Sequence, residues 1–218
     1  MILTGIISQN ENEKTSALIG SILSESGMKT SIIDFKELRN LDDKSVRSYT
    51  SELSKAGTDV LVLKIKPSDV ENAIPASIHF DVMIYNDKAD DLKEMDIDCY
   101  KNLIRQMFSR LDEKGTAILN VDYNELIQFL EGMKRHVVSY GFNSKASITA
   151  SSTGDSMTDN VFLCCLQRTI SARNGKLIEP QEYRINMGNN GFDAYDILAA
   201  TTFAVLNGVN INTPNYIS

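Results

Sequence analysis

The chain has 218 residues, a length that suits one domain of ordinary size or one domain with a small appendage. Hydrophobic residues make up 42% and charged residues 23%, which favours a soluble globular protein over a disordered chain. The net charge of −7 argues against a nucleic-acid-binding surface, because binding to phosphates requires clustered Lys and Arg. The apolar runs are too short to span a bilayer, and the N-terminus does not resemble a signal peptide. We therefore expect a cytoplasmic protein that binds no membrane.

Strands and helices alternate through the first two thirds of the sequence. Short β-branched or apolar runs predict the strands Ile2–Ser8, Thr30–Asp34, Asp59–Ile65, Phe80–Tyr85, Gly115–Val121 and Val137–Tyr140. Apolar residues at helical spacing, with Gly or Pro at the ends, predict the helices Glu13–Ser26, Ser45–Ala56, Pro67–Ile74, Asp96–Leu111 and Asn124–Met133. This alternation predicts an α/β fold with a mostly parallel, doubly wound sheet covered by helices on both faces.

The pattern changes after Tyr140. The next predicted strands are separated by polar or Gly-containing turns instead of helices, and they are Ala146–Ala150, Val161–Thr169 and Glu182–Asn186. We therefore predict a small antiparallel β portion at about residues 146–187. The last predicted element is the helix Ala194–Leu206. Since no repeat or linker interrupts the sequence, we predict a single domain over residues 1–218.

Three cysteines, Cys99, Cys164 and Cys165, leave an odd thiol and fit a reducing compartment. Cys164 and Cys165 are adjacent in a predicted strand, so their side chains should point to opposite faces and serve as small hydrophobic residues, not as a metal site. The two histidines are far apart, and neither lies in a nucleophile motif.

Four motifs occur in a fixed order along the chain. They are Lys14-Thr15-Ser16 after a strand and loop, Phe80–Asn86 followed by Asp90-Asp91-Leu92, Ala117–Asp122 followed by Ser139-Tyr140-Gly141, and Gly191–Ala200. In this order, they resemble motifs of the Mur ligase superfamily. The resemblance implies the P-loop-like, ATP-binding middle domain of these ligases. A full ligase would add a substrate domain before it and a further domain after it. Its members phosphorylate a carboxylate with ATP and let an amine displace the phosphate, which forms an amide in cell-wall (peptidoglycan) synthesis.

The resemblance also implies where a residual nucleotide cleft would lie. Its cofactor-binding positions would be Lys14, Thr15, Ser16, Asn86, Asp193 and Asp196. Asp193 and Asp196 stand where the adenine-side pattern of the family has Asn, and an ionised Asp cannot donate a hydrogen bond as an amide does.

The phosphate loop departs from the family pattern. The stretch Asn10–Thr15 lacks both glycines that let backbone N–H groups approach phosphates, and one of them is replaced by Glu13. At a separation of ~5 Å and an effective dielectric near 20, a carboxylate facing one phosphate charge costs about 3 kcal/mol. The alternative to a surviving phosphate loop is an ordinary helix start, in which Glu13 interacts favourably with the helix dipole.

The predicted metal-binding positions are altered as well. Lys64 stands where the family has a magnesium-binding Glu at the end of a strand, and Asp91 replaces a His. Ile104 takes the place of a carbamylated Lys, and its spacing from Tyr100 and Met107 suits an apolar helix face. The acidic residues Asp87, Asp90, Asp91 and Asp96 could form a metal cluster or, alternatively, a solvated acidic loop.

These substitutions favour a catalytically degenerate domain, or pseudoenzyme, that acts as a binding or interaction module without a cofactor. Its partner would be a protein, either a component of cell-wall synthesis or a second copy of the chain. The main alternative is a divergent ATP-binding subunit of an ATP-dependent amide ligase that retains Lys14 and Thr15 and requires ATP and Mg²⁺. A third hypothesis is a small-molecule sensor that uses the old cleft without hydrolysis.

Overall fold

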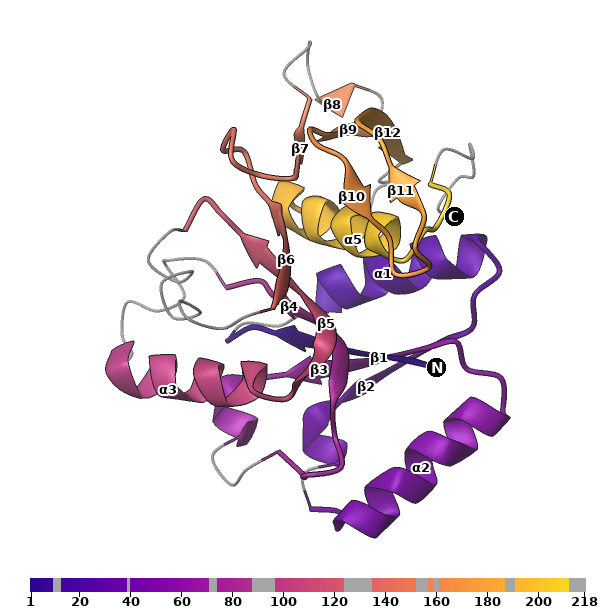
Figure 1. Ribbon diagram of the computed structural model, residues 1–218, viewed down its shortest axis with the longest axis vertical. Coiled ribbons are helices and arrows are strands. Elements are labelled where there is room, and N and C mark those ends of the chain that lie inside the picture. Colours follow the sequence, from indigo (N-terminus) through magenta and orange to yellow (C-terminus); the bar gives the residue numbers. More distant parts are fainter. Residues whose placement is uncertain are drawn as a thin grey trace.

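The computed structural model describes residues 1–9, 13–38, 40–70, 74–87, 97–123, 135–151, 157–158, 161–186 and 191–211 (Figure 1). Its main sheet has ten strands: β1 Ile2–Ile7, β2 Thr30–Asp34, β3 Val60–Ile65, β4 Phe80–Tyr85, β5 Leu111–Asn120, β6 His136–Tyr140, β7 Ile148–Ala150, β8 Met157–Thr158, β9 Val161–Leu166 and β12 Gln181–Asn186. A separate hairpin pairs β10 Ile170–Ser171 with β11 Leu177–Ile178. The helices are α1 Glu13–Glu25, α2 Asp43–Lys55, α3 Ile97–Phe108 and α5 Ala194–Leu206, with 3-10 turns η1 Phe35–Glu37 and η2 Pro67–Val70.

The strand order in the main sheet is β12-β9-β7-β6-β5-β4-β1-β3-β2, and β8 also pairs with β9. Strands β1 to β6 run parallel to their neighbours, and β7 adds to β6 in the same direction. Strand β9 is antiparallel to β7, β8 and β12. The predicted α/β fold, with a mostly parallel sheet and a small antiparallel portion, is confirmed. The prediction of a single domain stays a prediction.

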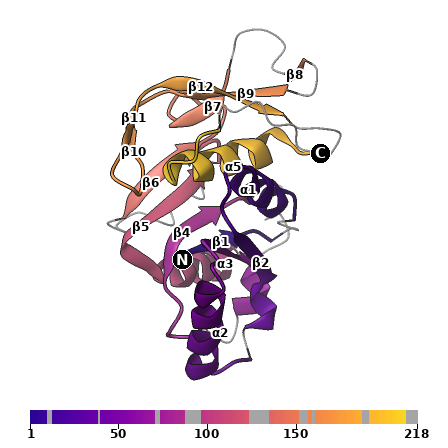
Figure 2. The ribbon, with the colours of Figure 1, turned by 90° about the vertical axis from the view of Figure 1, so that its right-hand side faces the viewer.

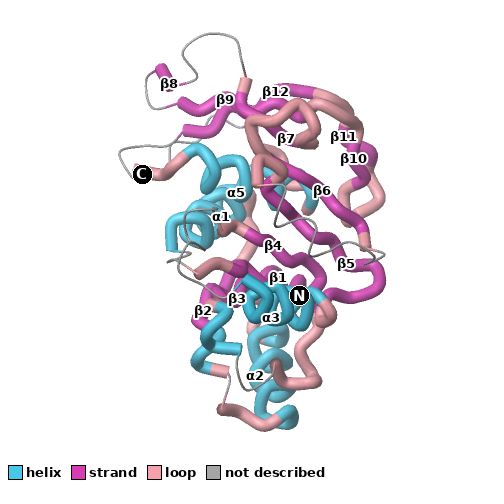
Figure 3. Tube along the Cα trace, turned by 90° about the vertical axis from the view of Figure 1, so that its left-hand side faces the viewer, coloured by secondary structure: helices cyan, strands magenta, loops and turns pink. Residues whose placement is uncertain are grey.

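Two apolar cores lie on opposite faces of the sheet because side chains alternate along each strand. In β3, Val60 and Val62 pack with residues of α1 and α5, whereas Leu61 and Leu63 pack on the other face, with η1, α2 and α3. Figures 2 and 3 show that the sheet curves, so that its antiparallel end lies over α5 while its parallel part lies on the other side of α1. This enclosure explains why all residues from Asp196 to Leu206 are buried.

Several element boundaries correct the sequence-based predictions. Helix α3 ends at Phe108, and Leu111 is the first residue of β5 instead of the last residue of the helix. The reason is tertiary: Leu111 pairs with Phe80 of β4, beyond a register shift in that strand pair. The short helix predicted to reach Ile74 is a 3-10 turn that ends at Val70. Helix α2 begins at Asp43, before Ser45, because Asp42 caps it by accepting a hydrogen bond from the Ser45 N–H.

Some predictions fall outside the described residues. They concern the helix Asn124–Met133, the loop residues Asn10–Asn12, and the acidic residues Asp90, Asp91 and Asp96. The prediction that the two adjacent cysteines point to opposite faces is confirmed, because Cys164 is fully buried while Cys165 is partly exposed. Burial raises the pKa of the Cys164 thiol to about 12. Within the described part of the chain, no helix is long and apolar enough to cross a membrane.

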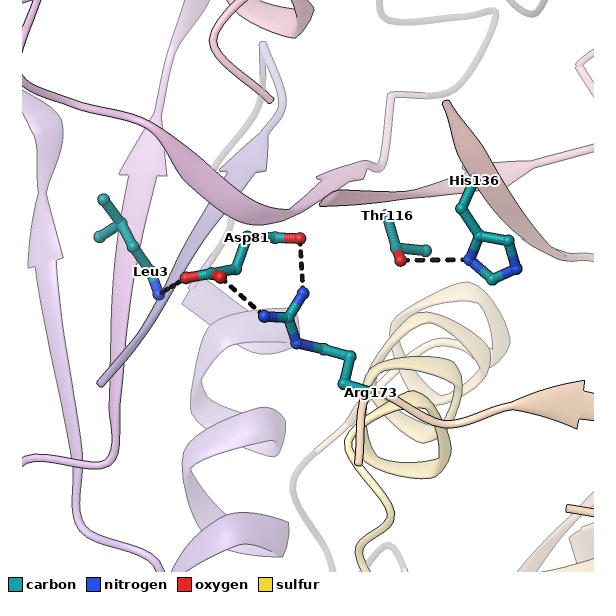
Figure 4. A network of polar contacts seen from close by, with 5 residues as sticks. All are labelled: Leu3, Asp81, Thr116, His136 and Arg173. Carbon is teal, nitrogen blue, oxygen red and sulfur yellow. Dashed lines mark hydrogen bonds and ion pairs between the residues drawn. The ribbon is translucent and has the colours of Figure 1, made fainter. Parts of the chain in front are cut away.

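The β10–β11 hairpin is fastened to the parallel sheet by Asp81 of β4 (Figure 4). Arg173, in the turn of the hairpin, donates to the Asp81 carboxylate at 2.6 Å and to its backbone carbonyl at 3.0 Å. The other carboxylate oxygen accepts a hydrogen bond from the Leu3 N–H of β1. The same turn contains Gly175, whose positive φ of 82° suits glycine. A second polar contact in this region joins Thr116 of β5 to His136 of β6 at 3.2 Å.

Candidate functional site

The carboxyl ends of strands β1, β3, β4, β5 and β6 lie at one edge of the sheet because these strands are parallel. Ligands of open α/β sheets bind at this kind of edge. Here it brings together the start of α1, the residues that follow β4, the end of β6 and the start of α5, which are far apart in the sequence. All six predicted cofactor-binding residues lie on these elements.

Lys14 and Ser16, at the start of α1, both make contacts within the protein. The exposed Lys14 ammonium group donates a 2.8 Å hydrogen bond to the carbonyl oxygen of Gly191, just before α5. The buried Ser16 hydroxyl donates to the Glu13 carbonyl oxygen at 3.1 Å, within its own helix. Lys14 therefore links the two segments that the resemblance assigns to the phosphate and adenine sides of a nucleotide.

Thr15, Asn86 and Asp196 form one hydrogen-bonded network. The Asn86 side-chain amide donates to the Thr15 hydroxyl at 2.9 Å, and this hydroxyl donates to Asp196 Oδ1 at 2.5 Å. Tyr140 extends the network, because its hydroxyl lies 2.7 Å from Asn86 Oδ1 and 3.2 Å from the carbonyl oxygen of Tyr85. The network joins α1, α5 and the ends of β4 and β6. The Ser139-Tyr140-Gly141 motif gives no indication of this role for Tyr140, because Tyr140 and its partner Asn86 lie 54 positions apart in the sequence.

Burial dominates the electrostatics of this network. Desolvation raises the pKa of the Tyr140 hydroxyl well above its ordinary value, and the nearby carboxylates of Asp196 and Asp193 add to the effect. Tyr140 therefore stays neutral and can donate to Asn86 over the whole physiological pH range. Thr15 and Asp196 are also almost fully buried, at 0% and 8% exposure. Their hydrogen bond is therefore largely shielded from competition by water.

Asp193 and Asp196 have a structural role at the start of α5. Asp193 is the N-cap residue, and its carboxylate accepts a hydrogen bond from the Asp196 N–H at 2.9 Å. The Asp196 carboxylate in turn accepts one from the Asp193 N–H at 3.3 Å, which completes a capping box. The spacing of two acidic residues before an apolar run could have revealed this cap in the sequence. At both positions where the resemblance assigns Asn, an Asp side chain therefore caps the N-terminus of α5.

Lys64, at the end of β3, pairs with two carboxylates. Its ammonium nitrogen lies 3.5 Å from Asp34 Oδ1 on β2 and 3.8 Å from Glu13 Oε1 on α1. Asp34 is directly opposite Lys64 in the parallel register of the two strands. The two residues that depart most clearly from the family pattern, Glu13 and Lys64, thus form an ion pair with each other.

The side chain of Asp87 is fully buried, which corrects the expectation of a solvated acidic loop for this one residue. One carboxylate oxygen accepts a 2.6 Å hydrogen bond from the Gln9 N–H, and the other accepts one from the Tyr100 hydroxyl of α3. Burial, with a smaller contribution from Asp87, raises the pKa of Tyr100. Asp87 therefore connects Gln9, the second residue after β1, to helix α3. Ile104 lies on the same buried helix face as Tyr100 and Met107, as predicted.

Asp122, just after β5, organises a group of aromatic residues at the same edge. Its carboxylate accepts hydrogen bonds from the N–H groups of Phe142 and Asn143, and from the Tyr195 hydroxyl at 3.1 Å. Tyr195 packs edge-on against Phe142, with ring centroids 5.3 Å apart, and lies near Tyr123. Asp122 therefore fixes the loop after β6 relative to the start of α5. The role of Asp122 is not predictable from local sequence patterns, because its partner Tyr195 lies 73 positions away in the sequence.

The resemblance implies ATP and Mg²⁺, and the described residues at this edge do not fit a magnesium site. Lys64 brings a cation to the position assigned to a carboxylate ligand. The Thr15 hydroxyl, which would bind Mg²⁺ in a phosphate loop, donates to Asp196. Among the residues described, no group of three or more His, Cys, Asp or Glu is arranged to hold a metal ion.

The geometry and the order of the strands define a Mur ligase-like fold. This class is confirmed by solved structures, which cover nearly all of the chain at low sequence identity. No protein-family model matches the sequence, and no curated protein sequence is significantly similar to it.

Three solved structures illustrate the similarity. A UDP-N-acetylmuramoyl-L-alanyl-D-glutamate–2,6-diaminopimelate ligase has a TM-score of 0.67 and 12% identity, over 97% of this chain and 44% of that one. UDP-N-acetylmuramate:L-alanyl-gamma-D-glutamyl-meso-diaminopimelate ligase from Neisseria meningitides has a TM-score of 0.63 and 13% identity, over 96% of this chain and 63% of that one. MurF ligase from Thermotoga maritima in complex with ADP has a TM-score of 0.54 and 14% identity, over 96% of this chain and 47% of that one. The chain thus spans about half the length of these ligases, and the likeness concerns the fold.

Proposed function

We propose that the chain is a catalytically inactive Mur ligase-like domain that acts in the cytoplasm as a protein-interaction module connected with peptidoglycan synthesis. The observation that carries the proposal is the use of the retained phosphate-loop side chains in internal contacts. Thr15 donates to the buried Asp196, and Lys14 donates to Gly191. A nucleotide would have to displace both contacts, and Glu13 would add a negative charge beside its phosphates.

The link to peptidoglycan synthesis rests on the similar structures, whose names describe ligases of muramoyl peptides. The partner would be a protein of the same process or a second copy of this chain.

The competing proposal is a divergent nucleotide-binding subunit of an ATP-dependent amide ligase. It is favoured by the exposure of Lys14, whose contact to a single carbonyl group is easily exchanged. One similar ligase is described in complex with ADP. In this case a partner protein would have to supply the metal ligands that the described residues do not offer.

Thermal denaturation with and without ATP and Mg²⁺ separates the two proposals. A ligand present at a hundredfold excess over its Kd stabilises a protein by about 2.7 kcal/mol, which is easily measured as a higher Tm. We expect no change in Tm for the unmodified chain. A higher Tm that Lys14→Ala abolishes, or ATP turnover that Lys14→Ala abolishes, would favour the nucleotide-binding subunit.

Self-association is tested independently by sedimentation equilibrium over a range of concentrations. A dimer would identify a second copy of the chain as a partner. A monomer at all concentrations would restrict the proposal to a different protein, and cross-linking to a full-length muramoyl peptide ligase would then be the direct test.

A further inference from the structure

The Lys64 side chain lies on the face of the sheet that α1 covers. Val60 and Val62, which are four and two residues before it in β3, pack in the core formed with α1 and α5, and Lys64 continues this alternation. Only 18% of its side chain is exposed. A cation removed from water to this degree requires partners of opposite charge.

These partners form a balanced chain of charges. Lys64 lies between Glu13 and Asp34, and the second carboxylate oxygen of Asp34 is 3.8 Å from the ammonium group of Lys36. Two ammonium groups and two carboxylates therefore alternate, and their charges cancel. The Glu13 side chain is 70% exposed, whereas the Lys64 side chain is the least exposed of the four.

We infer that the Lys64 ammonium group replaces a divalent metal ion at this edge of the sheet, as a covalently attached cation shared by Glu13 and Asp34. The inference deepens the proposed function and rests on it, because it explains how the site remains stable without Mg²⁺ or nucleotide. A divalent ion bound here would bring two uncompensated charges into a cluster that is already neutral. The two departures from the family pattern, Lys64 and Glu13, are then coupled, because the Glu13 carboxylate partly neutralises the Lys64 ammonium group that replaces the metal ion.

The test uses Mn²⁺ alone, because electron paramagnetic resonance distinguishes bound from free Mn²⁺ without any nucleotide. The unmodified protein should bind Mn²⁺ only weakly. Lys64→Glu places a third carboxylate beside Glu13 and Asp34, so it should bind Mn²⁺ at least tenfold more tightly. At an Mn²⁺ concentration about a hundredfold above the Kd, the Tm of this variant should rise by about 5 °C.

The matched control is Lys36→Gln, which also removes an ammonium group from Asp34 but leaves Lys64 in place. It should bind Mn²⁺ as weakly as the unmodified protein. If Lys64→Glu does not fold, Lys64→Gln decides the question, because it removes the cation without adding a charge and should bind Mn²⁺ more tightly than Lys36→Gln.

Two results would overturn the inference. One is that the unmodified protein binds Mn²⁺ as tightly as the Lys64 variants do. The other is that neither Lys64→Glu nor Lys64→Gln binds Mn²⁺ more tightly than Lys36→Gln. The experiment is independent of the test of the proposed function. Metal-free ATP binding that Lys14→Ala abolishes would favour the nucleotide-binding subunit and leave the role of Lys64 intact. Tight Mn²⁺ binding by the unmodified protein, without ATP turnover, would overturn the role of Lys64 and leave the inactive domain intact.

Discussion

The hydroxyl group of Thr15 donates a 2.5 Å hydrogen bond to the buried carboxylate of Asp196, which lies 181 positions further along the chain. This contact joins the N-terminal turns of the first and last helices. It converts a residue of the phosphate-loop motif into part of the hydrogen-bonded interior, and it determines what substitution of that residue should do.

Thr15→Val, which keeps the shape but removes the hydroxyl, should lower the free energy of unfolding by about 1–3 kcal/mol, because it leaves buried partners unsatisfied. Thr15→Ser keeps the hydroxyl and should cost less. A double-mutant cycle in denaturant with Asp196→Ala should give a coupling energy of about 0.5–3 kcal/mol. Strictly additive effects would show that the bond contributes nothing.

Alkaline pH should destabilise the protein through its buried tyrosines. Burial raises the pKa of Tyr100, Tyr140, Tyr183 and Tyr195 above the ordinary value of 10.0. Below pH 10 these groups are neutral in both states, so their contribution is fully present. Above it, the unfolded chain loses the protons first, and stability falls as the pH rises. Urea denaturation at increasing pH measures this loss.

Tyr140→Phe tests the origin of the alkaline effect. The variant should be less stable at neutral pH by about 1–3 kcal/mol, because Asn86 Oδ1 loses its donor. It should also lose less stability than the unmodified protein on going to alkaline pH, since one of the groups that titrate is gone. An unchanged pH dependence would exclude Tyr140 as a contributor.

Acid should weaken the contact between α2 and the segment before β4. The N–H and hydroxyl groups of Ser77 donate to the Asp43 carboxylate and lower its pKa from the ordinary value of 3.8. The stabilisation is therefore present above that value and is lost as the pH falls below it. Asp43→Asn should have a lower Tm at neutral pH and a smaller further decrease in acid. Parallel Tm curves for the two proteins would contradict the assignment.

Arg173→Met should loosen the β10–β11 hairpin. The Arg173 side chain makes two hydrogen bonds to Asp81, but the pair is about one quarter exposed, so we expect a loss of only about 1 kcal/mol. Hydrogen exchange of the hairpin amides should become faster, while exchange in β3 should not change. Lys176→Met, an exposed position in the same hairpin, is the matched control and should leave both rates unaltered.

The sequence predicted elements well where local patterns decide them. Strand β4 and helix α5 have the predicted bounds because apolar runs, an N-terminal acidic pair and Gly208 mark their ends. The sequence predicts Leu111 at the end of a helix, because the helical spacing of apolar residues continues past Phe108. Its position in β5 follows from its pairing with Phe80, which local patterns do not reveal. The role of Lys64 was not predictable from local patterns, since its partners belong to two other elements and meet it only through strand register and helix placement.

The position of β1 in the sheet has a consequence for folding kinetics. This first strand lies between β3 and β4, and helix α1, which follows it, packs against α5, the last helix. The residues of β1 and α1 thus pack against segments that follow them much later in the sequence. Such nonlocal topology slows folding, because long loops must close before the contacts form. Removal of residues 194–206 would leave the α1 residues that pack against α5 without that partner.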